Sequence, residues 1–278
     1  MTEAKKIELF LPNGDPTGCL MCDVANWDGK IFRLPKNLMT NYLERPELQY
    51  TGIYFLIGGQ DELKKLYIGE AENLSHRLVQ HINKDFWSEC LVITKKENAM
   101  NKAHAKFLEN YFYQLTKRIG RCIIVNGNTP TKSSISEADE AILNDFSQKV
   151  ADTIGVIGYR FLTPLIDVTK NTAEQFEITS KRLRPHVEAK GMITNEGFVV
   201  MKGSTSMPQF KPASSDSPRI KWEKLRSEGI IKNNTFVRDY LASSPSTAAA
   251  MVLGRNANGL TEWKTKNGKP LKKYLGTK

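Results

Sequence analysis

Two short hydrophobic runs, separated by a polar segment, most strongly limit how this chain can fold. Residues 52–58 (GIYFLIG) and 66–70 (LYIGE) are rich in β-branched and aromatic side chains, and residues 59–65 between them are mostly polar. Two such runs joined by a polar turn are typical of a β-hairpin. A helix is expected to follow, beginning near Asn73. The fold must therefore place a helix directly after a hairpin.

A second helix is predicted over residues 98–117. Its large apolar side chains recur at helical spacing and would face a core: Ala103, Phe107, Tyr111 and Leu115. Gly120 would end this helix, and residues 122–125 would form a third, short strand. We therefore predict that residues 49–135 form an α/β (α+β) domain in which a small antiparallel three-stranded sheet is flanked by helices.

Short strands are also expected before this domain. Residues 1–48 contain three runs with strand character, IELFLP, CLMCDVANW and KIFRLP, separated by turn residues. We predict that they form an N-terminal β extension. Cys19 and Cys22 form a C-x-x-C pair there, but residues three apart in a strand point to opposite faces. This geometry disfavours a zinc or redox site, and reduced thiols fit a cytoplasmic protein.

The rest of the chain is expected to form a connector and a second domain. Residues 136–185 would make a connector of helix and strand, and residues 186–278 a small C-terminal α/β domain. In the latter, Ser244 would cap a helix that Gly254 ends, and Asn267-Gly268 is a strong hairpin signal. No apolar run approaches the roughly 18 to 20 residues that span a bilayer, so no membrane segment is expected.

Side chains suited to phosphodiester hydrolysis occur in a fixed order through the hairpin and the helices after it. Arg77 and His81 are four residues apart, so both should project from one helix face. Arg77 offers a planar, charged fork that suits phosphate, and His81 could move a proton near neutral pH or bind phosphate. Glu109, in the second helix, is a hard oxygen ligand of the kind that Mg²⁺ takes singly. A site with one metal ion follows.

With these residues and the tripeptides Gly52-Ile53-Tyr54 and Tyr67-Ile68-Gly69, residues 50–130 resemble the GIY-YIG nucleases. The resemblance implies that the two tyrosines bracket the nucleophilic water, one of them as general base. It also implies that Arg77 binds the phosphate and that Glu109 holds Mg²⁺ or Mn²⁺.

The same resemblance implies a downstream asparagine that orients or caps the site without taking part in the chemistry. Asn126 directly follows the expected third strand and is preferred for this role, with Asn128 as the alternative. One position departs from the family pattern. Glu70 is acidic where some members carry a basic residue, so a phosphate contact is not expected there.

The segments SPSTAAA and GRNANG and the following Trp263 resemble the uncharacterised C-terminal domain that accompanies GIY-YIG nucleases in many bacterial proteins. This resemblance covers residues 190–278, which are also similar to RAMA, a module associated with restriction and DNA-methylation enzymes. Physically, the helix start at Ser244 and Ser246 could bind phosphate or be a simple cap. Trp263 could stack on a base or fill a core.

The charge of the chain is unevenly distributed. In total, 40 Lys+Arg and 30 Asp+Glu give a formal net charge of +10, which favours polyanionic partners. Residues 1–180 hold 21 basic and 23 acidic residues, whereas residues 181–278 hold 19 and 7. We therefore expect a metal-dependent DNA endonuclease, with a near-neutral catalytic half and a basic C-terminal domain that binds the nucleic acid.

Other functions are compatible with the same residues. A defence or restriction nuclease acting on modified or foreign DNA would agree with the RAMA resemblance. A non-catalytic nucleic-acid-binding protein would use the nuclease fold as a scaffold. RNA is an alternative substrate, because the site engages a phosphodiester and the sequence shows no recognised reader of the 2′-hydroxyl. A protein with one active site per chain could cut both DNA strands either as a dimer or in two successive binding events. The oligomeric state is therefore left open.

Overall fold

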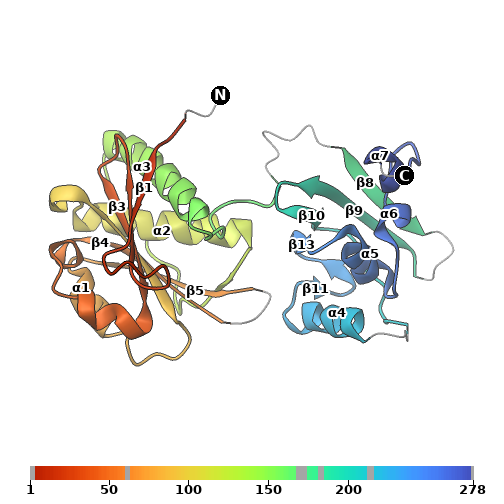
Figure 1. Cartoon of the computed structure of the whole chain (residues 1–278), viewed down its shortest axis with the longest axis horizontal. Helices are drawn as coiled ribbons and strands as arrows, with labels where there is room; N and C mark the ends of the chain where they lie inside the picture. Colours follow the sequence, from red (N-terminus) through yellow and green to blue (C-terminus); the bar gives the residue numbers. More distant parts are fainter. Residues whose placement is uncertain (1–3, 60–62, 167–173, 181–184, 212–215, 277–278) are drawn as a thin grey trace. The chain divides into compact units, whose positions relative to one another are not determined.

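The chain forms two compact units in the computed structural model, Met1–Pro164 and Leu165–Lys278 (Figure 1). Each unit combines a sheet with helices, which confirms the predicted mixed α/β class. No described helix is long and apolar enough to cross a bilayer. The centre of the expected hairpin turn, residues 60–62, lies outside the described residues. The structure describes residues 4–59, 63–166, 174–180, 185–211 and 216–276.

Within the described residues, unit 1 is built on a seven-stranded sheet with the order β1-β2-β3-β6-β4-β5-β7. Every neighbouring pair is antiparallel except β5 and β7, which are parallel. The strands are β1 (Ile7–Phe10), β2 (Leu20–Val24), β3 (Gly29–Pro35), β4 (Gly52–Gly58), β5 (Lys65–Ala71), β6 (Glu89–Lys95) and β7 (Ile123–Ile124).

This sheet differs from the three-stranded sheet expected from the sequence. The N-terminal strands pair through β3 with β6, so they continue the sheet that contains the β4–β5 hairpin. β6 is not expected from the sequence, because it pairs on both sides and its nearly continuous burial leaves no polar–apolar alternation to mark a strand. The strand expected at residues 122–125 is reduced to the two residues of β7.

The helices expected near Asn73 and over residues 98–117 are present, although the second begins at Lys102, and the helix expected in the connector belongs to unit 1. Asn73, Asn101 and Ser136 cap α1, α2 and α3, and each side chain accepts a hydrogen bond from a backbone N–H three residues later. Gly120 ends α2 in the left-handed conformation, with φ at 70°. The helices are α1 (Leu74–Val79), α2 (Lys102–Ile119) and α3 (Glu137–Val156), with 3-10 turns at η1 (Lys36–Tyr42), η2 (Pro46–Gln49) and η3 (Lys96–Asn98).

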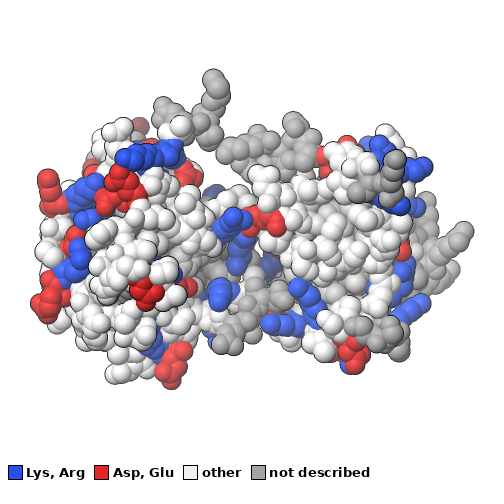
Figure 2. Space-filling view, in the orientation of Figure 1, with Lys and Arg blue, Asp and Glu red and all other residues white. Residues whose placement is uncertain are grey.

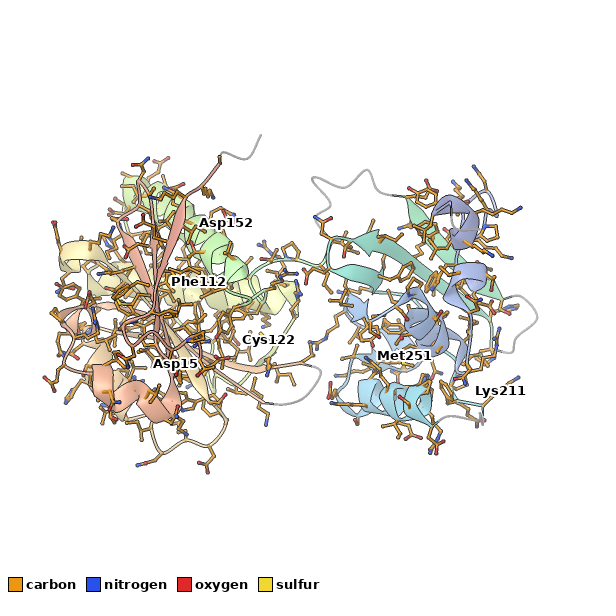
Figure 3. The ribbon with its side chains drawn as sticks, viewed as in Figure 1. Asp15, Phe112, Cys122, Asp152, Lys211 and Met251 are labelled. Atoms are coloured by element: carbon orange, nitrogen blue, oxygen red, sulfur yellow. The ribbon has the colours of Figure 1, made fainter. Side chains whose placement is uncertain are left out.

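Alternate side chains of β4 enter two separate cores. Ile53 and Phe55 pack with α2 and α3 on one face of the sheet, where Figure 3 shows Phe112 inside the unit. Tyr54 and Leu56 pack with α1 and the N-terminal 3-10 turn on the other face. All seven residues of β4 are buried, so this strand lies at the centre of unit 1. Close packing around the strand restricts the movement of the side chains that project from it.

The two cysteines of the C-x-x-C pair lie on opposite faces of the sheet, as expected. Cys19 belongs to the core on the α1 side and Cys22 to the core on the α2 side. Burial raises the pKa of Cys19 to about 11 and that of Cys22 to about 12, so both thiols stay protonated. The two sulfur atoms therefore cannot share one metal ion.

Unit 2 has an antiparallel sheet with the order β13-β10-β9-β8-β14 among its described residues, beside a two-stranded hairpin. Its helix α5 packs on this sheet, and Met251 of α5 is fully buried (Figure 3). The strands are β8 (Gln175–Ser180), β9 (Val187–Thr194), β10 (Gly197–Val200), β11 (Ile231–Lys232), β12 (Thr235–Phe236), β13 (Tyr240–Ala242) and β14 (Lys264–Thr265). The helices are α4 (Ser217–Ser227), α5 (Pro245–Leu253), α6 (Gly259–Glu262) and α7 (Leu271–Tyr274).

The hairpin expected at Asn267-Gly268 forms only in part. The turn is present, with Gly268 at φ 77° and its N–H bonded to the carbonyl of Thr265 at 2.8 Å. The expected second strand is reduced to a single bridge between Pro270 and Lys264, because Leu271 already begins α7. The turn therefore leads from an edge strand into a short helix.

Candidate active site

The β4–β5 register brings the two name-giving tripeptides side by side. Tyr54 pairs with Gly69, and Leu56 pairs with Tyr67, so the two tyrosines lie on the same face of the sheet. Their ring centroids are 6.1 Å apart and the rings are nearly parallel. A Cβ atom at Gly69 would collide with the ring of Tyr54, which explains why glycine occupies this position.

Arg77 projects from α1, whereas His81 lies in the turn directly after it, because α1 ends at Val79 and is shorter than the helix expected from the sequence. Both side chains nevertheless reach these rings. The hydroxyl of Tyr54 lies 3.0 Å from Nε2 of His81, and Nε of Arg77 donates to the same hydroxyl at 3.3 Å. The His81 ring is also 5.1 Å from that of Tyr67. These four side chains therefore form one connected cluster on one face of the sheet.

Burial divides this cluster into an inner and an outer pair. Tyr54 is fully buried and His81 is 2% exposed, whereas Tyr67 is half-buried and Arg77 is exposed. Arg77 also donates through a terminal nitrogen to Oε1 of Gln80 at 2.8 Å. Lys84 extends over the Tyr67 ring, with Nζ 5.6 Å from its centroid. The surface that a substrate can reach thus presents one phenol and two cations.

The inner pair is electrically neutral at physiological pH. Burial raises the pKa of Tyr54 far above its ordinary value, and the neighbouring Tyr67 raises it further. Burial lowers the pKa of His81 to about 4, and the positive charges of Lys84 and Arg77 act in the same direction. A neutral, buried imidazole is poorly suited to binding phosphate, so the geometry gives His81 a positioning role behind Tyr54.

Glu109 projects from α2, which packs against β5. Its side chain is half-buried, and burial raises its pKa to about 7. The negative charge of Glu70 raises this pKa further, whereas the charges of Arg77 and Lys106 lower it. Glu109 therefore interacts electrostatically with both Glu70 and Arg77. Glu70 follows Gly69 in β5, so the carboxyl of Glu109 is near this end of the strand.

The donor set around Glu109 suits a divalent cation that keeps most of its waters. Two carboxyl groups, Glu109 and Glu70, repel each other there, and a bound cation would relieve this repulsion. No group of three His, Cys, Asp or Glu residues that could hold a metal ion exists among the described residues. Mg²⁺ is commonly held by one or two carboxylates, with water and substrate completing its shell, so these residues fit it.

Asn126 fixes the edge of β5 from outside the strand. Its Oδ1 accepts the N–H of Ile68 at 3.0 Å, and its Nδ2 donates to the carbonyl of Ile68 at 2.7 Å. These two bonds lie beyond the β5–β7 pairing, two residues after its last pair, Leu66 with Ile124. Asn126 thus holds the backbone of Ile68, while the side chain of Asn128 is exposed.

Two residues of this region were not assigned a function from the sequence. Strand alternation places Glu70 on the same face as the buried Ile68, towards α2, and this signal was available in the sequence. Lys84 lies in the turn after α1, where no periodic pattern indicates the direction of a side chain. Its position over Tyr67 could be found only from the structure.

The motif residues of unit 2 have structural roles. Trp263 is fully buried, and its indole N–H donates to the carbonyl of Pro245 at 3.0 Å, so it fills the core. Ser244 caps α5 by accepting the N–H of Thr247, and Ser246 accepts the N–H of Gly259. Both hydroxyl groups are thus occupied within the fold.

The comparisons with known proteins match the second unit of the chain. Residues 179–275 match the family model of a domain of unknown function, DUF4357. No GIY-YIG family model matches the chain. No curated protein and no solved structure matches it.

Proposed function

We propose that unit 1 is a metal-dependent endonuclease of the GIY-YIG type that hydrolyses phosphodiester bonds in DNA. The convergence of Tyr54, Tyr67, Arg77 and His81 in one cluster supports this proposal most strongly. These residues come from two strands, a helix and the turn after it, and an exposed guanidinium lies beside a half-buried phenol. Such an arrangement can hold a phosphate and a water molecule next to each other.

In the proposed mechanism, the phenolate form of Tyr67 takes a proton from the attacking water and becomes a neutral phenol. It is the tyrosine that solvent reaches, whereas Tyr54 is fully buried and its raised pKa keeps it protonated. Arg77 binds the phosphate and offsets the charge that develops on its oxygens. Tyr54 accepts a bond from Arg77 and donates one to neutral His81, so the inner pair sets the orientation of the guanidinium.

Glu109, with Glu70 beside it, is proposed to hold Mg²⁺ or Mn²⁺. When bound, such an ion stabilises negative charge on the phosphate and the leaving oxygen. The raised pKa of Glu109 means that ion binding displaces a proton near neutral pH. Metal affinity should therefore increase as the pH rises through about 7.

The test is cleavage of plasmid and single-stranded DNA with and without Mg²⁺ or Mn²⁺. We expect Tyr67→Phe, Arg77→Ala and Glu109→Gln each to lower the rate by roughly 10²- to 10⁴-fold. Tyr111→Phe and Arg118→Ala are matched controls on the far flank of α2, and both should cleave at close to the rate of the unmodified protein. Equal cleavage by all five variants would refute the site, and binding without cleavage would favour a scaffold role.

Unit 2 is proposed to supply affinity for the DNA that unit 1 cuts. Its excess of basic residues supports this assignment. A role in recognising modified DNA, as in a restriction enzyme, rests on the RAMA resemblance. Faster cleavage of methylated than of unmodified duplex would support that role, and equal cleavage would count against it.

A further inference from the structure

Five exposed lysines gather at one end of unit 2, around the turn between β14 and α7. No acidic residue occurs in the sequence after Glu262, so this segment is uniformly basic. Two backbone bonds close the turn, from Gly268 to Thr265 at 2.8 Å and from Thr265 to Lys269 at 2.9 Å. We call residues 264–273 the lysine turn; its basic residues are Lys264, Lys266, Lys269, Lys272 and Lys273.

Four of the five lysines of the lysine turn have no acidic partner among the described residues. Lys264, Lys266, Lys269 and Lys273 form no ion pair within the described part of the chain. Glu177 pairs with Lys264 in the β8–β14 register but makes no ion pair with it there. Figure 2 shows basic atoms at the end of unit 2 where Figure 1 labels α7.

Helix α4 also carries four basic residues, but its basic side chains have neighbouring partners. Arg219 pairs with Asp216 at 3.2 Å and with Glu223 at 2.9 Å, and Lys224 pairs with Glu228 at 3.6 Å. Arg226 lies over the ring of Trp222, 4.0 Å from its centroid, and is half-buried. The basic side chains of α4 thus have partners inside the fold, whereas Lys264, Lys266, Lys269 and Lys273 of the lysine turn are exposed and make no ion pair among the described residues.

We propose that the lysine turn is a nucleic-acid contact surface of unit 2 and that its ligand is the phosphodiester backbone of DNA. Lysine ammonium groups act on phosphates as mobile point charges, which gives affinity without sequence preference. An anionic membrane fits less well, because α7 has only four residues and the apolar surface beside the lysines is limited to Tyr274 and Leu275. The choice of DNA as the polyanion rests on the proposed function. A DNA-binding measurement alone, without cleavage, tests whether the lysine turn is the contact surface.

The experiment compares two double variants that remove the same amount of charge. Both are made in the full chain carrying Glu109→Gln, so that DNA is bound without being cut. Lys266→Gln/Lys269→Gln changes the lysine turn, and Arg219→Gln/Lys224→Gln changes α4. Binding of a short fluorescent DNA duplex is followed by anisotropy over a series of salt concentrations.

We expect the lysine-turn variant to lose about 1.8 from the slope of log K against log salt, because each phosphate contact contributes about 0.9. This corresponds to roughly 50-fold weaker binding at about 0.1 M salt. The α4 variant should keep the slope of the parent protein. All four side chains are at the surface, and equal melting temperatures would show that both variants fold.

An unchanged slope in the lysine-turn variant would overturn the proposal, as would equal losses in the two variants, since the latter would indicate a general effect of net charge. Binding to anionic lipid vesicles that is lost in the lysine-turn variant while DNA binding persists would also overturn it. Because no cleavage is measured, failure of the proposed endonuclease activity would leave this result interpretable.

Discussion

At the scale of single residues, the two tyrosines of the site have different environments although their motifs mirror each other. Tyr54 lies over Gly69, bonded to His81 and Arg77 and closed to solvent, whereas Tyr67 reaches the surface beside Lys84. The sequence can predict that these residues share a face, because helical and strand spacing determine direction. The sequence cannot predict how far each side chain is buried, because its solvent exposure depends on the residues that pack over it. The neutral state of His81 follows from that packing.

The half-buried carboxyl of Glu109 should make the stability of the metal-free protein depend on pH. Its pKa is raised from 4.5 to about 7 in the folded state, so the folded chain holds a proton that the unfolded chain releases between these values. The free energy of unfolding should therefore fall as the pH rises from about 4.5 to 7. Glu109→Gln should remove this fall, which is about 1 kcal/mol after allowance for partial exposure.

Urea denaturation of both proteins in EDTA, at several pH values between about 5 and 8, measures this effect. The difference between the two curves isolates Glu109, because His81 contributes equally to both proteins. With its pKa at about 4, His81 lowers stability at acidic pH. Added Mg²⁺ should stabilise the protein with glutamate and not the variant. Parallel curves for the two proteins would show that Glu109 does not titrate in this range.

At the scale of elements, the sequence predicts the helices of unit 1 better than its sheet. Asn73, Asn101 and Ser136 each cap a helix, although α2 begins four residues after the start expected at residue 98. β6 carries no such local mark. It is a central strand because β3 and β4 pair with its two edges, and these partners are far from it in sequence. Non-local pairing of this kind also explains why the N-terminal strands belong to the same sheet.

The side chain of Asn126 is bonded to the backbone of β5 at Ile68, so Asn126→Ala should destabilise the hydrogen bonding at this edge of the strand. The substitution leaves the N–H and the carbonyl of Ile68 without their partner, at a cost of about 2 kcal/mol. We expect the Ile68 amide to exchange hydrogen at least roughly 10-fold faster. Asn128→Ala is the matched control and should change stability by less than about 0.5 kcal/mol, since its side chain is exposed. Equal exchange in both variants would remove Asn126 from the site.

At the scale of the whole molecule, the boundary between the units also divides the charge. Residues 1–164 contain 20 Lys+Arg and 20 Asp+Glu, so the entire net charge of +10 belongs to Leu165–Lys278. The expected contrast between a near-neutral half and a basic half therefore coincides with a structural boundary. The composition alone could not identify which basic residues face solvent without a partner, because ion pairs within α4 depend on the fold.

Removing unit 2 should separate cleavage from affinity. Both hydrophobic cores of unit 1 consist of residues before Pro164, so a chain that ends there should keep its fold and its site. We expect it to bind DNA more weakly, with a flatter dependence of log K on log salt, because the basic unit is absent. Metal-dependent cleavage should persist at low salt and high DNA concentration. A truncated chain that binds DNA as tightly and as salt-sensitively as the full chain would show that unit 1 alone holds the nucleic acid.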